Sequence, residues 1–244
     1  MGVGLGSFDG LHTGHMILVN TLFEESKLRG LDSVVYTFTE HPENIIKKQL
    51  YNPLITTVEK KEQLLGLSQL DYLYFDEFNE EFSHLLPEEF VRNILVEKLN
   101  AKLVVVGFNY RFGYKGKGDV CLLREYGEKY GFDVIEIPPI KIDDEIVSST
   151  LVRHYISEGN MEKVLKLLGR RYSIRGFVKE GKKLGGKMGF PTANTYPDSS
   201  LIMPSFGVYA TRTLVKGKYY NSITNVGKNP TFGNSDRISV ETFI

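Results

Sequence analysis

The chain has 244 residues, of which 41% are hydrophobic, and its 30 basic and 30 acidic side chains leave a net charge near zero. This length suffices for one large domain or two smaller ones. The neutral balance argues against a broad basic face, so nucleic acid and anionic membranes are not expected partners. Only one cysteine is present and no apolar run reaches membrane-spanning length, which favours a cytoplasmic protein.

Residues 1 to about 165 alternate short β-branched or aromatic runs with longer amphipathic runs, which is typical of an α/β domain with a parallel sheet. The predicted strands are 1–5, 33–38, 71–75, 102–107 and 133–137. The predicted helices are 14–29, 58–67, 87–99, 120–130, one that starts near 148, and 161–168. Ligands of such sheets bind beyond the carboxyl ends of the strands, so residues that follow these strands are expected to converge on one crevice.

The stretch Gly6-Ser7-Phe8-Asp9-Gly10-Leu11-His12-Thr13-Gly14-His15 leads from the first predicted strand into the first predicted helix. The N–H groups and the dipole at a helix start favour phosphate binding. Two imidazoles beside that phosphate can stabilise negative charge that develops on phosphorus. The same pair also fits a capped helix start or half a metal site, although Cys121 has no partner pattern that would complete a zinc site.

A loop rich in glycine and aromatic residues, Gly107 to Gly118, follows the strand predicted at 102–107. Tyr110 or Phe112 could stack on a flat heteroaromatic ligand while Asn109 fixes its edge. The alternative is a surface hairpin whose aromatic residues pack locally.

The segment Ser148-Ser149-Thr150-Leu151-Val152-Arg153 places hydroxyls and a guanidinium at the start of another predicted helix. Hydroxyls and N–H groups there bind phosphate oxygens, and the arginine one turn later can brace a triphosphate. The alternative is an ordinary helix N-cap followed by a solvated arginine.

The texture of the sequence changes at Gly169-Arg170-Arg171, after which glycine, proline and short alternating runs dominate. The runs at 172–178, 207–215, 219–226 and 238–244 predict a small β-barrel or sandwich. We therefore expect two domains, residues 1–169 and 170–244.

The pattern Gly6-x-Phe8-Asp9-Gly10-x-His12-x-Gly14-His15 resembles the signature of the HxGH nucleotidylyltransferases, and most closely that of the bacterial FAD synthetases. The loop at 107–113 and the Ser-Ser-Thr-x-x-Arg element resemble further motifs of that family in the same order. The resemblance implies a Rossmann-like FMN adenylyltransferase, a nucleotidyltransferase that makes FAD and pyrophosphate from FMN and ATP with Mg²⁺.

The resemblance also implies roles for single residues. His12 and His15 would stabilise charge on the α-phosphate. The implied ATP-binding residues are Gly6, Phe8, Gly14, Ser148, Ser149, Thr150 and Arg153. The implied flavin-binding residues are Asn109, Arg111, Phe112 and His41. Two positions depart from the family pattern, since Tyr110 replaces a phenylalanine and Glu40 stands where a proline usually precedes the histidine.

Residues 181–194, 207–209 and 225–231 resemble the riboflavin kinase module of bifunctional FAD synthetases. There Thr192 and Asn194 would hold Mg²⁺ and nucleotide phosphates, and Glu241 would take the proton of the riboflavin hydroxyl. Gly186 and Phe243 depart from the family pattern, and the sequence ends at Ile244, where relatives continue. We therefore expect an incomplete kinase-like barrel without activity.

Two other functions remain open. The chain is alternatively a bifunctional riboflavin kinase/FMN adenylyltransferase, or a non-catalytic sensor of flavin nucleotides. A cytidylyltransferase or a pantetheine-type adenylyltransferase explains neither the loop at Asn109 nor the string Phe190-Pro191-Thr192-Ala193-Asn194. The expected partners are the small molecules ATP and FMN, and the sequence does not indicate an oligomeric state.

Overall fold

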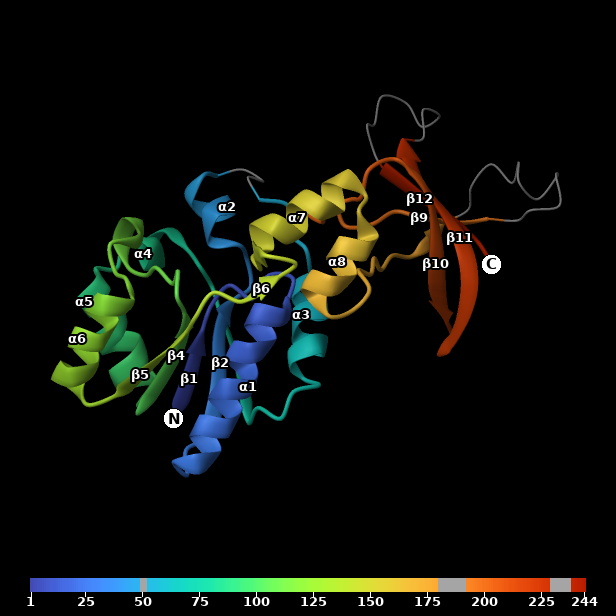
Figure 1. The fold of residues 1–244 in the computed structure, drawn as a ribbon. Helices are drawn as coiled ribbons and strands as arrows, with labels where there is room; N and C mark the ends of the chain where they lie inside the picture. Colours follow the sequence, from blue (N-terminus) through green and yellow to red (C-terminus); the bar gives the residue numbers. More distant parts are fainter. Residues whose placement is uncertain (49–51, 180–191, 229–237) are drawn as a thin grey trace. The chain divides into compact units, whose positions relative to one another are not determined.

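The computed structural model describes residues 1–48, 52–179, 192–228 and 238–244, which form two compact units (Figure 1). The first unit comprises Met1–Val152 and Lys166–Gly169. The second comprises Arg153–Leu165 and Arg170–Ile244. Most of the two helices at 149–158 and 161–168 therefore groups with the C-terminal region.

The first unit is built on a five-stranded parallel sheet, as predicted. Its strands are β1 (Gly2–Leu5), β2 (Ser33–Phe38), β3 (Tyr72–Asp76), β4 (Leu103–Gly107) and β5 (Asp133–Ile137), in the order β3-β2-β1-β4-β5. The chain moves outward from β1 through β2 to β3, and then returns to place β4 on the other side of β1. The order therefore reverses between β1 and β4, and such a switch point is where open parallel sheets bind ligands.

The long helices lie close to where the sequence predicts them. They are α1 (Thr13–Leu28), α3 (Val58–Leu65), α6 (Val120–Tyr130), α7 (Ser149–Glu158) and α8 (Met161–Leu168). The predicted helix 87–99 is instead a short α5 (Pro87–Phe90) that continues as a π-helical segment, η1 (Val91–Lys98). Over so few turns, the spacing of apolar side chains does not distinguish the two kinds of helix.

Several short elements are not predicted from the sequence, because each helix spans less than two turns and the hairpin has only two residue pairs. They are α2 (Pro42–Ile46), α4 (Glu80–Ser83), the 3₁₀ turn η2 (Tyr114–Gly116) and the hairpin of β6 (Lys141–Ile142) with β7 (Glu145–Ile146). Elements of this length carry too little periodicity to be recognised.

Apolar side chains cover the parallel sheet on both faces. In β4, Val104 and Val106 face one cluster, which includes residues of η1 and α6, and Leu103 and Val105 face another, which includes residues of α1 and α3. A strand buried on both faces is expected to be continuously apolar. This burial explains the run Leu103–Val106 without polar alternation.

Helix α1 packs unusually close to β1. A Cβ atom added at Gly4 would lie 2.8 Å from Cδ2 of the buried Leu22, and one added at Gly2 would lie 2.0 Å from Oγ of Ser26. Glycine at these positions therefore sets the distance between strand and helix.

The second unit holds a five-stranded antiparallel sheet in the order β10-β11-β12-β9-β8. Its strands are β8 (Val178–Lys179), β9 (Ala193–Thr195), β10 (Gly207–Val215), β11 (Lys218–Lys228) and β12 (Ile238–Phe243). The predicted run 172–178 forms a strand only at its end, and β9 is an addition. The α/β first region and the β-rich second region are thus confirmed.

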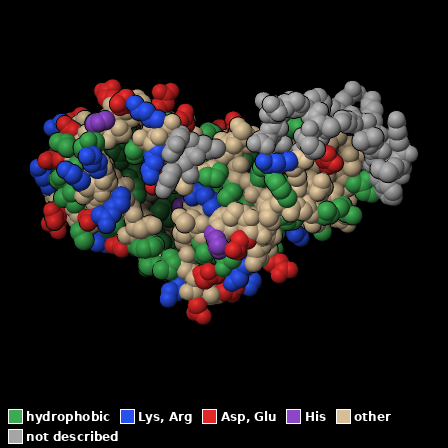
Figure 2. Space-filling model, turned by 90° about the horizontal axis from the view of Figure 1, so that it is seen from above, with side chains coloured by type: hydrophobic (Ala, Val, Ile, Leu, Met, Phe, Trp, Pro, Cys, Tyr) green, Lys and Arg blue, Asp and Glu red, His purple; other side chains and the backbone are tan. Residues whose placement is uncertain are grey.

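Basic and acidic side chains are interspersed on the face shown in Figure 2, in keeping with the balanced charge of the sequence. Within the described residues, none of the helices combines the length and the apolar character needed to cross a bilayer.

The tight packing at Gly4 leads to a prediction about stability. Gly4→Ala forces Leu22 to move within a filled core and should lower the free energy of unfolding by about 1–3 kcal/mol. Gly207→Ala is the matched control, because nothing lies within 4 Å of a Cβ atom there. Chemical denaturation of both variants checks this, and equal stability of the two would contradict the packing described here.

Candidate active site

The turn between β1 and α1, residues 6–11, has a constrained backbone. Phe8, Gly10 and Leu11 all have positive φ angles, of 50°, 80° and 41°. This conformation is unfavourable for Phe and Leu, and it persists only where the surroundings hold it. The side chains of Phe8 and Leu11 are fully buried in the core beside α1, which anchors the turn from within.

The two histidines lie together at the start of α1. The rings of His12 and His15 stack with their centroids 3.7 Å apart and their planes 13° apart, and Phe8 contacts the His15 ring. His12 is the N-cap, and its Nδ1 accepts a hydrogen bond of 3.2 Å from the backbone N–H of His15. Since Nδ1 is the acceptor, we infer that the proton of the neutral ring is on Nε2, which is then the donor nitrogen.

Gly14 makes room for this pair. A Cβ atom at Gly14 would lie 3.3 Å from Cε1 and Nδ1 of His12. A side chain there would crowd the ring, which is a local reason for the glycine in the His-x-Gly-His pattern.

Asp9 fastens the turn to the segment that precedes α3. Its buried carboxylate accepts hydrogen bonds from the backbone N–H groups of Ile55 and Thr56, each at 3.0 Å, and from the Thr56 hydroxyl at 3.2 Å. The Thr56 hydroxyl in turn accepts from the N–H of Gly10 at 3.1 Å. Asp9 belongs to the motif at 6–15, where its sequence position suggests no role, and the structure shows that it holds the turn in place.

The start of α7 reaches the same turn. The Ser149 hydroxyl donates to the backbone carbonyl of Asp9 at 2.9 Å, so the third motif meets the first. The Ser148 hydroxyl accepts from the N–H of Leu151 at 3.2 Å and caps the helix, and Thr150 is exposed. Arg153 follows one turn later on α7, where the second compact unit begins, and its role in ATP binding stays a prediction.

The loop after β4 lies on the other side of the switch point from the histidine turn, which is the segment 6–15 that joins β1 to α1 and carries His12 and His15. Asn109 and Arg111 are exposed, and Arg111 pairs with Asp119, the N-cap of α6, at 3.4 Å. Phe112 is only 5% exposed, and its ring packs between those of Phe90 and Tyr110. The structure therefore places Phe112 in the core rather than on the loop surface.

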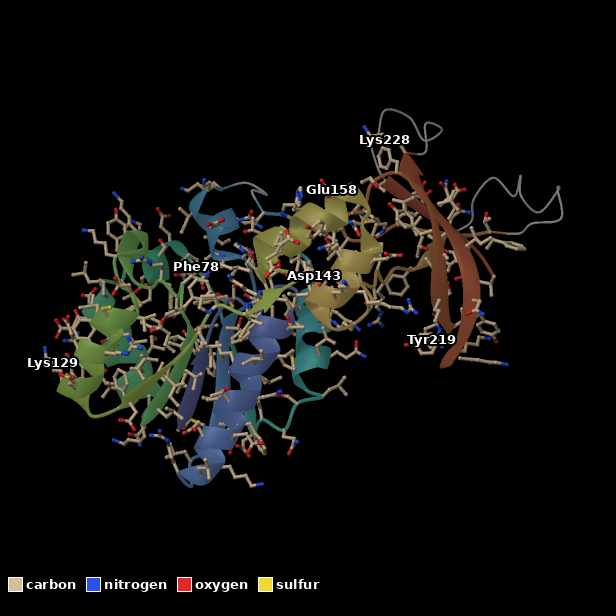
Figure 3. The ribbon with its side chains drawn as sticks, viewed as in Figure 1. Phe78, Lys129, Asp143, Glu158, Tyr219 and Lys228 are labelled. Atoms are coloured by element: carbon tan, nitrogen blue, oxygen red, sulfur yellow. The ribbon has the colours of Figure 1, made fainter. Side chains whose placement is uncertain are left out.

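Three other aromatic rings, which the sequence analysis does not identify, gather near the carboxyl ends of β2 and β3. Phe38, Phe78 and Phe82 are half-buried, and their ring centroids lie 5.1–5.4 Å from one another. Phe78 comes two residues after β3 and is labelled in Figure 3. Aromatic residues just beyond a strand end are the signal that could have identified them.

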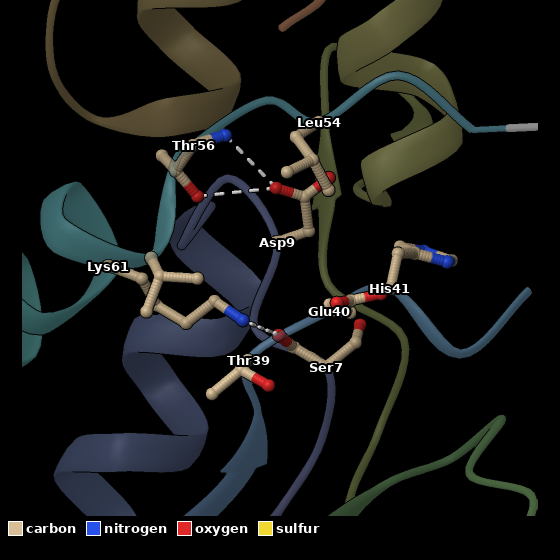
Figure 4. Close-up of a pocket in the computed structure, with 9 residues that line it drawn as sticks. Ser7, Asp9, Thr39, Glu40, His41, Leu54, Thr56 and Lys61 are labelled. Carbon is tan, nitrogen blue, oxygen red and sulfur yellow. Dashed lines mark hydrogen bonds between the residues drawn. The ribbon is translucent and has the colours of Figure 1, made fainter. Parts of the chain in front are cut away.

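A small pocket adjoins the histidine turn (Figure 4). Its lining includes Ser7, Asp9, Thr39, Glu40, His41, Thr56 and Lys61. His41 is the N-cap of α2, and its Nδ1 accepts from the N–H of Glu43 at 3.3 Å, so the expected flavin neighbour also has a structural contact.

Lys61 is another residue that no sequence motif marks. It is 7% exposed, and its ammonium donates to the carbonyls of Ser7 at 2.8 Å and Phe38 at 3.1 Å. Burial lowers the pKa of this ammonium to about 8, against the opposing influence of the Asp9 carboxylate. A lysine in an amphipathic helix gives no sign in sequence that it will be buried.

In the second unit, two of the three predicted kinase-site residues lie side by side. Asn194 on β9 is paired directly with Glu241 on β12, so their side chains share one face of the sheet. Thr192 is exposed just before β9. The string Gly189-Phe190-Pro191, and the glycines at 181, 185 and 186, lie outside the described residues, as do Pro230 and Thr231.

Comparison with known protein families matches both halves of the chain. Residues 1–151 match the FAD synthetase family, and residues 168–244 match the riboflavin kinase family.

Individual relatives give the same result. The chain is 35% identical to a bifunctional riboflavin kinase/FMN adenylyltransferase from Buchnera aphidicola over 96% of its own length and 76% of the relative's. It is 34% identical to the protein of that name from Listeria monocytogenes, over 99% and 77% of the two chains.

A solved structure described as a macrolide-efflux protein from Streptococcus pneumoniae has a TM-score of 0.86 and 32% identity, over 99% of this chain and 79% of that one. Similarity at this level extends the shared fold over both units. By these matches, the chain belongs to the family of bifunctional riboflavin kinase/FMN adenylyltransferases.

Proposed function

We propose that the first unit transfers the adenylyl group of ATP to FMN, which releases pyrophosphate and yields FAD. The observation that supports this most directly is the stacked pair His12 and His15 at the start of α1, beside the switch point of a parallel sheet. N–H groups of a helix start and imidazole donors suit a phosphate that gains negative charge.

The reaction requires the protein to position the two substrates and to stabilise the charge of the transition state. An oxygen of the FMN phosphate forms a bond to the α-phosphorus of ATP while the bond to the β-phosphate oxygen breaks and pyrophosphate leaves. His12 donates through Nε2 to an oxygen of the α-phosphate, where charge accumulates in the transition state. Gly14 keeps that ring uncrowded.

The flavin ring needs a flat apolar surface and polar groups at its edge. The half-buried rings of Phe38, Phe78 and Phe82, with the exposed Asn109 beyond β4, support such a site at the carboxyl ends of the strands. Phe112 supports it from the core by packing under Tyr110, instead of stacking on the ligand.

Magnesium fits this site as a companion of ATP. Among the residues described, no group of three His, Cys, Asp or Glu side chains gathers into a candidate metal site. Mg²⁺ commonly keeps several waters and binds to substrate phosphates with few protein ligands, and it would neutralise the departing pyrophosphate.

We also propose that the second unit phosphorylates riboflavin, so that the chain is bifunctional. This alternative fits the matches better than the expectation of an inactive kinase-like region, because residues 168–244 match the riboflavin kinase family and the relatives named above are bifunctional. Glu241 beside Asn194 supports it, since a carboxylate can accept the proton of the attacking hydroxyl next to an amide that holds phosphate or Mg²⁺.

The histidines give the first test of adenylyl transfer. His12→Asn retains an N-cap acceptor but removes the ring, and it should lower kcat for FAD formation by about 100-fold or more with little change in KM. His15→Ala should act in the same direction. His84→Ala is the control, because the ring of this exposed histidine stacks on Tyr114. Near-normal kcat in both His12 and His15 variants would remove the proposed role.

A second test separates the two activities. With riboflavin, ATP and Mg²⁺, the unmodified chain should produce FMN and then FAD, as followed by chromatography. Glu241→Gln should lower FMN formation by about 100-fold or more while FAD formation from added FMN persists. His12→Asn should still form FMN from riboflavin but should lose FAD formation. Flavin binding without any pyrophosphate release would instead favour a non-catalytic sensor.

A further inference from the structure

Lys61 is a buried cation whose contacts lie beside the proposed site of adenylyl transfer. Its ammonium bridges the carbonyls of Ser7 and Phe38, at 2.8 and 3.1 Å. Figure 4 shows the hydrogen bond from Lys61 to Ser7. Ser7 follows β1 and Phe38 ends β2, so this one side chain connects the carboxyl ends of neighbouring strands.

The carbonyl of Ser7 comes directly before the strained part of the turn. Phe8 has a φ of 50°, and strained backbone persists only where surrounding contacts hold it. The Ser7 carbonyl accepts a second hydrogen bond from the buried Thr37 hydroxyl at 3.2 Å. Lys61 and Thr37 thus hold Ser7, the first residue of the turn that leads to His12.

We propose that Lys61 is a positioning residue for adenylyl transfer, whose ammonium holds the Ser7–Leu11 turn and thereby places His12 and His15. The inference rests on the proposed function of the first unit. Lys61 acts through the backbone, because it is 7% exposed and both its described hydrogen bonds go to main-chain carbonyls.

The charge of Lys61 matters to this role. Hydrogen bonds from an ammonium to a carbonyl are stronger than those from a neutral amine. Asp9, Glu40 and His41 are the charged or titratable groups that line the pocket with Lys61, and burial lowers the pKa of its ammonium to about 8. The hold on the turn therefore weakens as pH rises above about 8.

The main experiment compares Lys61→Met with Lys60→Met, its neighbour on α3, whose ammonium donates to the side chain of Gln63. A loosened turn misplaces the imidazoles, so Lys61→Met should lower kcat for FAD formation by about 10- to 100-fold. KM for ATP and FMN should change by less than about threefold, because substrate contacts remain. Lys60→Met should leave both constants unchanged.

Three results bear on the inference directly. An unchanged kcat in folded Lys61→Met would overturn it, and so would a raised KM for ATP at constant kcat, which indicates a contact with substrate. If the unmodified chain makes no FAD from FMN and ATP, the proposed function itself fails. Lysine variants are interpreted only when that activity is present, so the two failures are distinguishable.

Thr37→Val serves if Lys61→Met does not fold. It keeps the shape of the buried side chain and removes only the second donor to the Ser7 carbonyl. The variant should lower kcat by about threefold or more at unchanged KM. An unchanged kcat would overturn the inference in that case.

The pH dependence of kcat provides a further readout. In the unmodified chain, kcat should fall as pH rises through about 8, as the Lys61 ammonium loses its charge. This decline should be absent in Lys61→Met, which has low kcat throughout. A Lys61→Met profile that declines in parallel with the unmodified one would assign the decline to another group and contradict the role of this charge.

Stability should change with pH in the opposite sense. The pKa of Lys61 is about 8 in the folded chain, below its ordinary value of 10.5, so between these values the unfolded state binds more protons. Stability therefore rises with pH across this window and is insensitive to Lys61 below it. Denaturation at pH 7.5 and 10 should show this rise reduced in Lys61→Met. If the free energy of unfolding changes equally with pH in the unmodified chain and in Lys61→Met, Lys61 is not buried in solution.

Discussion

The proposed adenylyl-transfer site depends on the attachment of one strained turn to the segment 55–61. Residues 7–11 have three positive φ angles, and isolated backbone would not keep this shape. Asp9 accepts hydrogen bonds from Ile55 and Thr56, and Lys61 donates to Ser7. Because the turn leads directly into α1, these contacts determine where the two imidazoles lie.

The parallel sheet explains why motifs that are far apart in sequence lie beyond the carboxyl ends of neighbouring strands. The turn after β1 and the loop after β4 flank the point where strand order reverses, and Ser149 joins the start of α7 to Asp9. The second unit adds an antiparallel sheet with its own polar pair, Asn194 and Glu241. Under the proposed functions the two units are chemically linked, since the FMN made by one is consumed by the other.

Much of this architecture is predictable from sequence. The bounds of β2, β5, α6, α8 and β10 coincide with the predicted ranges, because apolar periodicity and caps mark such elements clearly. His12 and His15 were recognisable because their motif sits at a strand-to-helix turn, and the structure brings their rings into contact.

The remaining features depend on tertiary packing. The sequence suggests that the Phe112 ring stacks on a ligand, yet the ring lies in the core. There the backbone of Phe112 pairs with Gly118, and the ring packs against Phe90. Lys61 looks like one of several solvated lysines of an amphipathic helix. Only the positions of two strand ends show that its ammonium is buried, and no local pattern encodes them.

The N-cap contact of His12 limits how this ring can act. While Nδ1 accepts the N–H of His15, the imidazole has room for one proton only, on Nε2, and is electrically neutral. Such a ring can polarise a phosphate oxygen but cannot cancel its negative charge. As long as this hydrogen bond in the first turn of α1 is intact, the positive charge that balances a bound triphosphate has to come from a group other than His12.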